Sequence, residues 1–281
     1  MSKQLSPLVL ASLLILLALL VTAALSPYVA PHNPTRERLI DRLLPPAWAS
    51  EGELKYLLGT DHLGRDIVSR IVYGSRVSLI VGFAAVSVGG AFGIALGLGA
   101  GFIGRRVDEA IMALADMQLA FPTILLAIAI IAVLGPSFTN LVVVIGISGW
   151  VTYARIARGQ VLSLRDKEFV EAIRAQGGGQ VRILFRHILP NILSPLIVVA
   201  TLDLARTIVL ESTLSFLGLG VQPPTSSWGA MLSDGREYLL SAWWIATFPG
   251  IALMLTALSF NRLGDWVRDL TDPRLRRSEL R

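Results

Sequence analysis

Long uncharged apolar runs alternate with short polar segments along most of the chain. A helix needs about 20 mostly apolar residues to cross a bilayer, and residues 8–25 and 77–104 each form an uncharged run of that kind. Residues 117–154 are also uncharged but are too long for one span. A Gly-Pro-Ser break at 135–137 divides them, because proline removes a backbone donor and disfavours helix before it.

The spacing of these runs predicts an all-α membrane protein with six transmembrane helices. The expected spans cover about residues 8–28, 77–103, 118–134, 138–157, 189–211 and 242–263. The first run is too long for the core of a cleaved signal peptide and lacks a small-x-small site, so a membrane anchor is favoured. The predicted organisation is an N-terminal helix with an outer segment (1–75), a transmembrane domain (76–265) and a basic tail (266–281).

Composition and charge support a chain surrounded by membrane lipid. Of its 281 residues, 53% are hydrophobic and 16% are charged, against about 25% charged residues in soluble domains. The net charge of +5 would also suit nucleic-acid binding. With the N-terminus inside, however, sixteen of the 25 Lys and Arg residues fall in cytoplasmic loops and the tail, as the positive-inside rule requires. The basic loop 158–188 and both termini are therefore predicted to be cytoplasmic, and nucleic-acid binding is disfavoured.

That cytoplasmic loop contains a polar stretch between two apolar runs. A short helix is expected over 166–176, with Asp166 or Ser163 as its N-cap. Gly177 is expected to end it by adopting a positive φ. A charged helix at the membrane surface is costly to bury in lipid and accessible to another protein, so the loop is predicted to be a handle for a partner.

The same stretch resembles the EAA loop of binding-protein-dependent ABC importer permeases. In that pattern Glu-Ala-Ala is followed by three residues, a Gly, about nine more residues, and an apolar-x-Leu-Pro ending. The residues that fit are Glu171, Ala172, Gly177, Leu189 and Pro190. Ile173 replaces the second Ala of the pattern, and His187 stands where many members have an apolar residue.

Three further blocks, 58–66, 211–224 and 272–276, are similar to the second-permease branch of the dipeptide and oligopeptide transporters. The resemblance implies a type I ABC importer permease fold with a cytoplasmic coupling helix, in a bacterial inner membrane, serving peptide uptake. It also implies four kinds of partner: a homologous second permease, two ATP-binding subunits, an extracytoplasmic solute-binding protein and lipid. ATP and Mg would be bound by the ATP-binding subunits.

The resemblance further assigns roles in the loop. Phe169 and Ile173 would pack into a groove of an ATP-binding subunit, and Glu171 and Arg174 would make polar contacts there. The chain has no Gly-x-x-x-x-Gly-Lys-Ser/Thr loop, so it is not expected to bind ATP in the P-loop manner, to hold a cofactor or to be an enzyme.

Charged residues within the predicted spans are candidates for the translocation pathway, because such residues are expensive in lipid and face a cavity or a partner. Asp203 and Arg206 lie three apart and share one helix face. They either form a mutual ion pair or line the substrate path. Glu211 begins an outer segment in which Gly218 and Gly220 permit an irregular backbone. That segment is either a gate or a re-entrant loop.

Two other motifs have structural interpretations. Four glycines recur every fourth residue in the second span and allow close approach of another backbone: Gly89, Gly93, Gly97 and Gly101. Packing within the chain is favoured over a seam against a second permease. In the block 58–66, Asp61 or Thr60 would cap the next helix, or the block would contact a soluble partner. Metal binding by His62 with Asp61 and Asp66 is disfavoured because a fourth ligand is missing.

Other function classes remain as alternatives. A nickel or glutathione importer would share the same blocks. An intramembrane hydrolase needs paired catalytic residues at membrane depth, but Asp203 is the only acidic residue clearly within a span. Proton-driven secondary transport would not need the cytoplasmic handle, and no inverted repeat is apparent. The sequence does not identify the substrate.

Overall fold

The structure, a computed structural model, describes residues 6–271 of the chain. These residues form helices and connecting segments without strands. Lys3 and the predicted block 272–276 with the rest of the basic tail lie outside the described residues. The helices in chain order are α1 (Pro7–Ala24), α2 (Ser26–Val29), η1 (Leu39–Asp41), α3 (Ile67–Ile103), α4 (Arg105–Leu119), α5 (Thr123–Leu134), α6 (Phe138–Leu164), α7 (Glu168–Ala175), α8 (Gln180–Arg182), the π-helix η2 (Ile183–Ile188), α9 (Leu189–Phe216), α10 (Trp228–Gly235), η3 (Arg236–Tyr238) and α11 (Trp244–Thr271).

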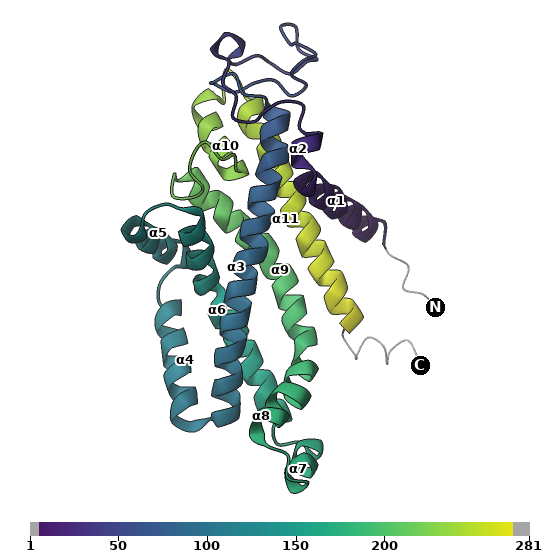
Figure 1. Cartoon of the computed structure of the whole chain (residues 1–281), viewed down its shortest axis with the longest axis vertical. Coiled ribbons are helices and arrows are strands. Elements are labelled where there is room, and N and C mark those ends of the chain that lie inside the picture. The colour runs from purple at the N-terminus through teal and green to yellow at the C-terminus, as the bar shows by residue number, and fades with distance from the viewer. Residues whose placement is uncertain (1–5, 272–281) are drawn as a thin grey trace.

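The long helices form an elongated bundle in which α1 packs obliquely on α3 and α11 (Figure 1). Five of the described helices are long and apolar enough to cross a membrane, and the bent pair α4–α5 makes a sixth if it is one broken span. The predicted all-α, six-span membrane fold is confirmed in this form. The largest hydrophobic cluster joins five helices through Leu16, Leu79, Tyr153, Ile208 and Phe260.

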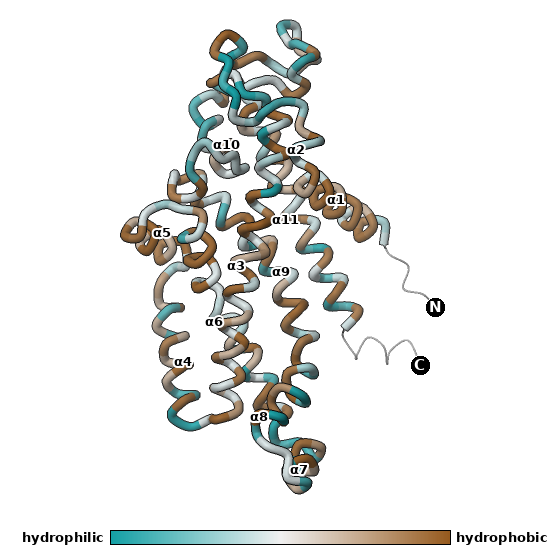
Figure 2. Tube along the Cα trace, viewed as in Figure 1, coloured by the Kyte–Doolittle hydropathy of each residue, from teal (hydrophilic) through white to brown (hydrophobic). Residues whose placement is uncertain are grey.

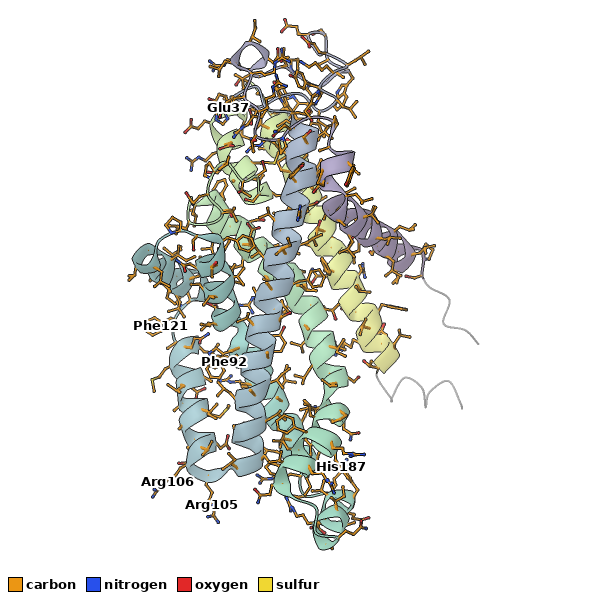
Figure 3. All side chains as sticks on the ribbon, viewed as in Figure 1. Glu37, Phe92, Arg105, Arg106, Phe121 and His187 are labelled. Carbon is orange, nitrogen blue, oxygen red and sulfur yellow. The ribbon has the colours of Figure 1, made fainter. Side chains whose placement is uncertain are left out.

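The two ends of the bundle differ in composition. Apolar residues dominate the middle of the long helices, whereas hydrophilic residues gather in the loops beside α2 and α10 (Figure 2). Arg105, Arg106 and His187 lie toward the end that carries α7, and Glu37 lies at the opposite end (Figure 3). We call the end that carries α7 the inner end, and the end that carries residues 30–66 the outer end.

The prediction of one straight span over 118–134 is wrong. The chain forms α4 and α5 there, and the two helices meet at 90° across residues 120–122. Pro122 explains the break, because the residue before a proline is disfavoured in the α-helical region. With 12 residues, α5 is about 18 Å long and cannot cross a bilayer alone.

The boundaries of the other spans also shift. The second span begins at Ile67 rather than near residue 77, because the Asp66 carboxylate accepts the backbone N–H of Ser69 at 2.9 Å and caps α3. The predicted caps at Thr60 and Asp61 are therefore wrong. At 37 residues α3 is about 55 Å long, so it extends beyond the bilayer. The fourth span continues to Leu164, and the sixth runs from Trp244 to Thr271.

The glycine stripe of α3 packs against α6 of the same chain. A side chain at Gly89, Gly93 or Gly97 would collide with the backbone carbonyl oxygen of an α6 residue. A side chain at Gly101 would press on Val161, also in α6. The prediction of packing within the chain is confirmed, because α6 occupies the face that a seam with a second permease would need.

Candidate functional sites

The loop predicted to be a handle contains α7, which projects from the inner end of the bundle (Figure 1). Val170 is fully buried in the main hydrophobic cluster, together with Ile183 and Ile188. An eight-residue helix is marginal in water on its own. The Val170 anchor and the turns at both ends therefore hold α7 on the bundle.

The outward side of α7 is exposed and amphipathic. Phe169 retains 39% of its exposure, and Ala172, Glu171 and Arg174 are also exposed. None of the charged residues described in α7 makes an ion pair within the described residues. Ile173, expected beside Phe169 in a groove of a partner, instead packs partly on the chain's own cluster. Only its remaining surface is available to a partner.

A Schellman turn ends α7 and sets its angle to the following helix. Gly177 has φ of +81°, as predicted. Its N–H donates to the Arg174 carbonyl at 3.0 Å, and the Gly178 N–H donates to the Ile173 carbonyl at 2.9 Å. These two bonds are the pattern of a left-handed helix cap. A Cβ at Gly177 would meet nothing within 4 Å, so the backbone conformation alone requires glycine there.

The start of α7 differs from the prediction. Its N-cap is Lys167, which makes no side-chain capping bond. Ser163 lies within α6 and donates to the Gln160 carbonyl instead, and Asp166 pairs with Arg165 at 3.3 Å. The predicted caps at Ser163 and Asp166 are wrong because α6 continues seven residues past the expected end of the span, from 157 to Leu164.

The Leu-Pro end of the motif opens α9. Leu189 is partly buried against the main cluster, and Pro190 is the second residue of α9. Because proline has no N–H, it cannot donate a helix bond to the turn before it, which is the π-helix. The preceding residues are already helical: α8 leads into the π-helix η2, which runs directly into α9. The fifth span thus extends from Gln180 to Phe216 as one helical unit.

Asp203 and Arg206 do not form the ion pair that the sequence suggested as one possibility. Asp203 accepts a hydrogen bond from the Tyr153 hydroxyl at 3.0 Å, between α9 and α6. Within the described residues, no nitrogen of Arg206 lies within 4.0 Å of a carboxylate. Although three residues apart, the two side chains thus have different surroundings.

Arg206 lines a hollow of about 360 Å³ beside the break between α4 and α5. Its walls combine the start of α5 with one side of α9. The lining residues are Pro122, Thr123, Ile124, Arg206, Val209, Leu210 and Thr213. Thr123 begins α5, whose N-terminus has no side-chain cap. An unpaired guanidinium beside free helix N–H groups can attract an anionic group at membrane depth.

Glu211 does not open an irregular outer segment, because α9 continues through it to Phe216. Its side chain is fully buried. The carboxylate accepts hydrogen bonds from the hydroxyls of Ser215 at 2.8 Å and Ser78 at 3.1 Å. Glu211 therefore joins α9 to α3 and lines no open passage in this conformation. The irregular backbone begins after α9, where Gly218 has φ of +78°.

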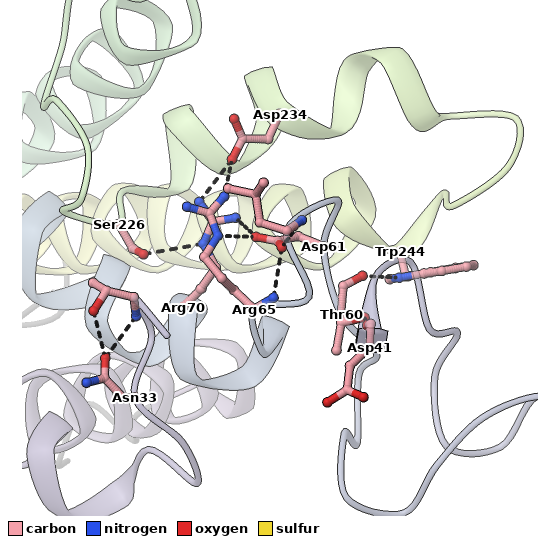
Figure 4. A network of polar contacts seen from close by, with 11 residues as sticks. Asn33, Asp41, Thr60, Asp61, Arg65, Arg70, Ser226, Asp234 and Trp244 are labelled. Atoms are coloured by element: carbon pink, nitrogen blue, oxygen red, sulfur yellow. Dashed lines mark hydrogen bonds and ion pairs between the residues drawn. The ribbon is translucent and has the colours of Figure 1, made fainter. Parts of the chain in front are cut away.

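A buried ionic network occupies the outer end (Figure 4). The Asp61 carboxylate accepts a bond from Arg65 Nε at 2.6 Å and is also bound by Arg70. Both guanidiniums contact Asp234, at 3.2 and 3.0 Å. Asp61 is completely buried and Arg70 is 3% exposed. We call Asp61, Arg65, Arg70 and Asp234 the outer lock, because they tie the segment before α3 to α10.

The outer lock explains the charged residues Asp61 and Arg65 of the block 58–66 without a metal ion. Burial would raise the pKa of Asp61, but the guanidiniums of Arg70 and Arg65 and a backbone N–H overcome this and hold the pKa below its ordinary value. His62 lies near Asp61 and Asp234 but stacks on Tyr238. Two guanidiniums already occupy the carboxylates, so the cluster does not suit a cation.

Three important residues were not singled out from the sequence. Val170 anchors α7, and its spacing of three from Ile173 could have indicated an inward side of the helix. Tyr153 is the partner of Asp203, and Asp234 completes the outer lock. No local pattern marks these last two, because their partners are 50 or more residues away.

Sequence and structure comparisons agree with this architecture. Residues 93–277 match the sequence model of the binding-protein-dependent transport system inner membrane component. Residues 6–46 match the N-terminal transmembrane domain of oligopeptide transport permease C. The fold is similar to that in a structure of the MetNI methionine ABC transporter in inward-facing conformations, with a TM-score of 0.59 and 19% identity over 72% of this chain and 97% of that chain.

Several curated relatives align along nearly the whole chain. The di/tripeptide transport system permease protein of Pseudomonas aeruginosa is 43% identical, over 95% of this chain and 88% of the relative. The dipeptide transport system permease protein of Alkalihalophilus pseudofirmus is 44% identical, over 98% and 89%. That of Haemophilus influenzae is 40% identical, over 94% and 90%. The chain belongs to the binding-protein-dependent transport system inner membrane component family and is a transmembrane permease subunit of an ABC importer.

Proposed function

We propose that this chain forms half of a translocation pathway for di- or oligopeptides in a bacterial inner membrane. It would pair with a homologous second permease, and the two would receive peptide from an extracytoplasmic solute-binding protein. Relatives at 40–44% identity that are named for dipeptide transport support the substrate class. Both chain termini would be cytoplasmic, in keeping with the basic residues at the inner end.

The exposed side of α7 carries the proposal that the chain is driven by separate ATP-binding subunits. Its charged side chains make no ion pair with any residue that the structure describes, and Phe169 is left partly exposed. An ATP-binding subunit would hold Phe169, Glu171 and Arg174, and would push α7 against the Val170 anchor. ATP and Mg would be bound by those subunits, so this chain would need no cofactor and would not be an enzyme.

Arg206 is the residue of this chain best placed to meet an anionic group in transit. It lines the hollow beside the α4–α5 break and makes no ion pair within the described residues, although Asp203 is near enough to interact with it electrostatically. The carboxylate of a peptide would satisfy it without a permanent ion pair. Asp203 is a weaker candidate because it accepts a hydrogen bond from Tyr153. Glu211 is also a weaker candidate, because it is buried and accepts hydrogen bonds from three serine hydroxyls.

Reconstitution tests the substrate and the energy source together. The chain, a second permease and two ATP-binding subunits would be placed in proteoliposomes with the binding protein supplied outside. ATP-dependent uptake of a labelled dipeptide is expected, with competition by other dipeptides. Uptake by this chain alone under a pH gradient would instead indicate secondary transport. Preferential competition by glutathione or a nickel complex would replace the peptide assignment.

The proposed orientation can be tested by labelling, because the chain has no cysteine of its own. One variant would carry a single cysteine at Ala49, in the segment at the outer end, and another at Arg174, in α7. Intact cells that express each variant would be treated with a membrane-impermeant thiol reagent. Labelling is expected at Ala49 alone. Labelling at Arg174 from outside would overturn the orientation.

A further inference from the structure

Two adjoining hollows flank the outer part of α3. The larger, of about 750 Å³, lies among the residues after α2, the outer turns of α3 and the loop before α10. The second, of about 590 Å³, lies between α1 and α3. Arg76 and Ile80 line both, so the two spaces adjoin each other along this side of the bundle.

The chemistry of the two hollows differs. The space between α1 and α3 is lined by apolar side chains apart from Arg76 and Ser87. The larger space carries polar groups near its outer rim, among them His32, Asn33 and Thr35. We call the space between α1 and α3 the channel and the larger space the chamber. The chamber has a mainly apolar lining with polar groups among it, and Arg76 lines both spaces.

Arg76 has no anion of its own. It is exposed, and it makes no ion pair or hydrogen bond within the described residues. None of the residues that line either hollow is acidic. Asp66, which pairs with His32 at 3.4 Å, is buried and already accepts two hydrogen bonds from Ser69. The chamber therefore has positive charge without a counter-ion, which favours phosphate over any cation.

The position of Arg76 fits the level of lipid headgroups. It directly precedes the uncharged run 77–104 of α3. The channel then descends along α3 from Arg76 to Ser87, about 16 Å at the rise of an α-helix. A group with an anionic head at Arg76 and a long apolar tail toward Ser87 matches both the depth and the lining.

We propose that an anionic phospholipid occupies these hollows, with its phosphate on Arg76 and an acyl chain between α1 and α3. The chamber beside His32 and Asn33 would hold the headgroup. Leu20, Ala23 and Ala24 of α1 line the channel, so the lipid would complete the contact between α1 and the bundle. This site is separate from α7 and from the hollow at Arg206, and it does not depend on which solute is transported.

Native mass spectrometry of the assembled permease complex tests the site. The complex would be reconstituted with equal amounts of phosphatidylglycerol and phosphatidylethanolamine, and the retained lipid would be identified. Wild type is expected to keep phosphatidylglycerol in preference. Arg76→Gln should lower that preference about five-fold, as expected for one basic residue near an anionic lipid surface. Arg36→Gln removes another exposed, unpaired arginine at the outer end and should leave the preference unchanged.

A second variant probes the channel separately from the charge. Ala24 is exposed on α1 and lines the channel, so Ala24→Phe should reduce retention of both lipids while the complex stays assembled. Equal retention of the two lipids by wild type, or the same loss in Arg36→Gln as in Arg76→Gln, would overturn the proposal. So would an Arg76→Gln complex that keeps its lipid but fails to capture the solute-binding protein, because the surface would then belong to that protein.

Discussion

The outer lock at one end of this permease and α7 at the other have opposite arrangements of charged residues. At the outer end, Asp61 and Arg70 are buried and paired within the chain. At the inner end, Glu171 and Arg174 of α7 are exposed and unpaired within the described residues. Buried charges destabilise a protein unless they are paired, whereas exposed charges cost little.

The difference indicates which surface is available to bind a partner. The outer lock closes the segment before α3 onto α10 with bonds supplied by the chain itself (Figure 4). α7 is held by Val170 and a glycine turn, and the charged residues on its polar side make no ion pair within residues 6–271. Changes at the outer end should therefore harm folding, and changes at the inner end should harm transport while sparing the fold.

Deleting a charge from the outer lock should have the largest effect on stability. Asp61→Asn keeps the shape of the side chain but leaves Arg65 and Arg70 buried with Asp234 alone. The expected loss of unfolding free energy is on the order of 3–5 kcal/mol, measured by thermal unfolding of the purified complex. Asp166→Asn makes the same substitution in an exposed pair and should cost less than about 1 kcal/mol. Equal effects would remove the contrast between the two ends.

Strong acidification should weaken the outer lock. The folded-state pKa of Asp61 lies below its unfolded value, so its contribution is fully present above the ordinary carboxyl pKa and is lost as the pH falls through the folded pKa. The difference in unfolding temperature between wild type and Asp61→Asn should therefore shrink at strongly acidic pH. A difference that grows on acidification would contradict the assigned direction.

Gly177→Val should separate transport from folding. The φ of +81° strains a β-branched residue by roughly 1–2 kcal/mol, and this strain would alter the angle of α7 without removing a contact residue. The variant should reach the membrane at near-normal level but transport poorly and fail to transmit stimulation of ATP hydrolysis. Gly179→Val is the matched control, because Gly179 has φ of −65° and open space around it. Wild-type transport by Gly177→Val would show that the α7 turn is not the handle.

Glu171→Lys should have the smallest effect on stability and still reduce transport. Glu171 lies in the first turn of α7, so reversing its charge costs about 0.3–1 kcal/mol through the helix dipole. Uptake and retention of the ATP-binding subunits should both fall, since the charge of the exposed side is reversed. The uptake and subunit retention of Glu171→Gln should lie between those of wild type and those of Glu171→Lys. Unchanged uptake in both variants would place the contact elsewhere on α7.

Much of the fold was predictable because it depends on local patterns. Uncharged runs of sufficient length mark the spans, since lipid excludes charge whatever the neighbouring helix is. The four-residue glycine spacing predicted a helix face for close packing, and α6 occupies it. The positive φ of Gly177 was also predictable, because glycine relieves the strain of a left-handed helix cap.

Other features depend on residues that meet only in the folded chain. The partner of Asp203 proved to be Tyr153, 50 residues away, rather than its neighbour Arg206. A shared helix face permits an ion pair but does not decide which way each side chain turns. The bend between α4 and α5 follows the local signal of Pro122, but that signal does not specify its angle of 90°.

The sequence by itself determined the membrane class, most of the spans and the glycine turn that ends α7, because hydrophobic length and glycine geometry act within one helix or turn. Only the tertiary structure decided that Asp61, Arg65, Arg70 and Asp234 form one network, that Glu211 is buried among serines, and that Arg206 makes no ion pair within the described residues. The physical reason is that the cost of a buried charge depends on the groups brought beside it, and those groups come from distant parts of the chain.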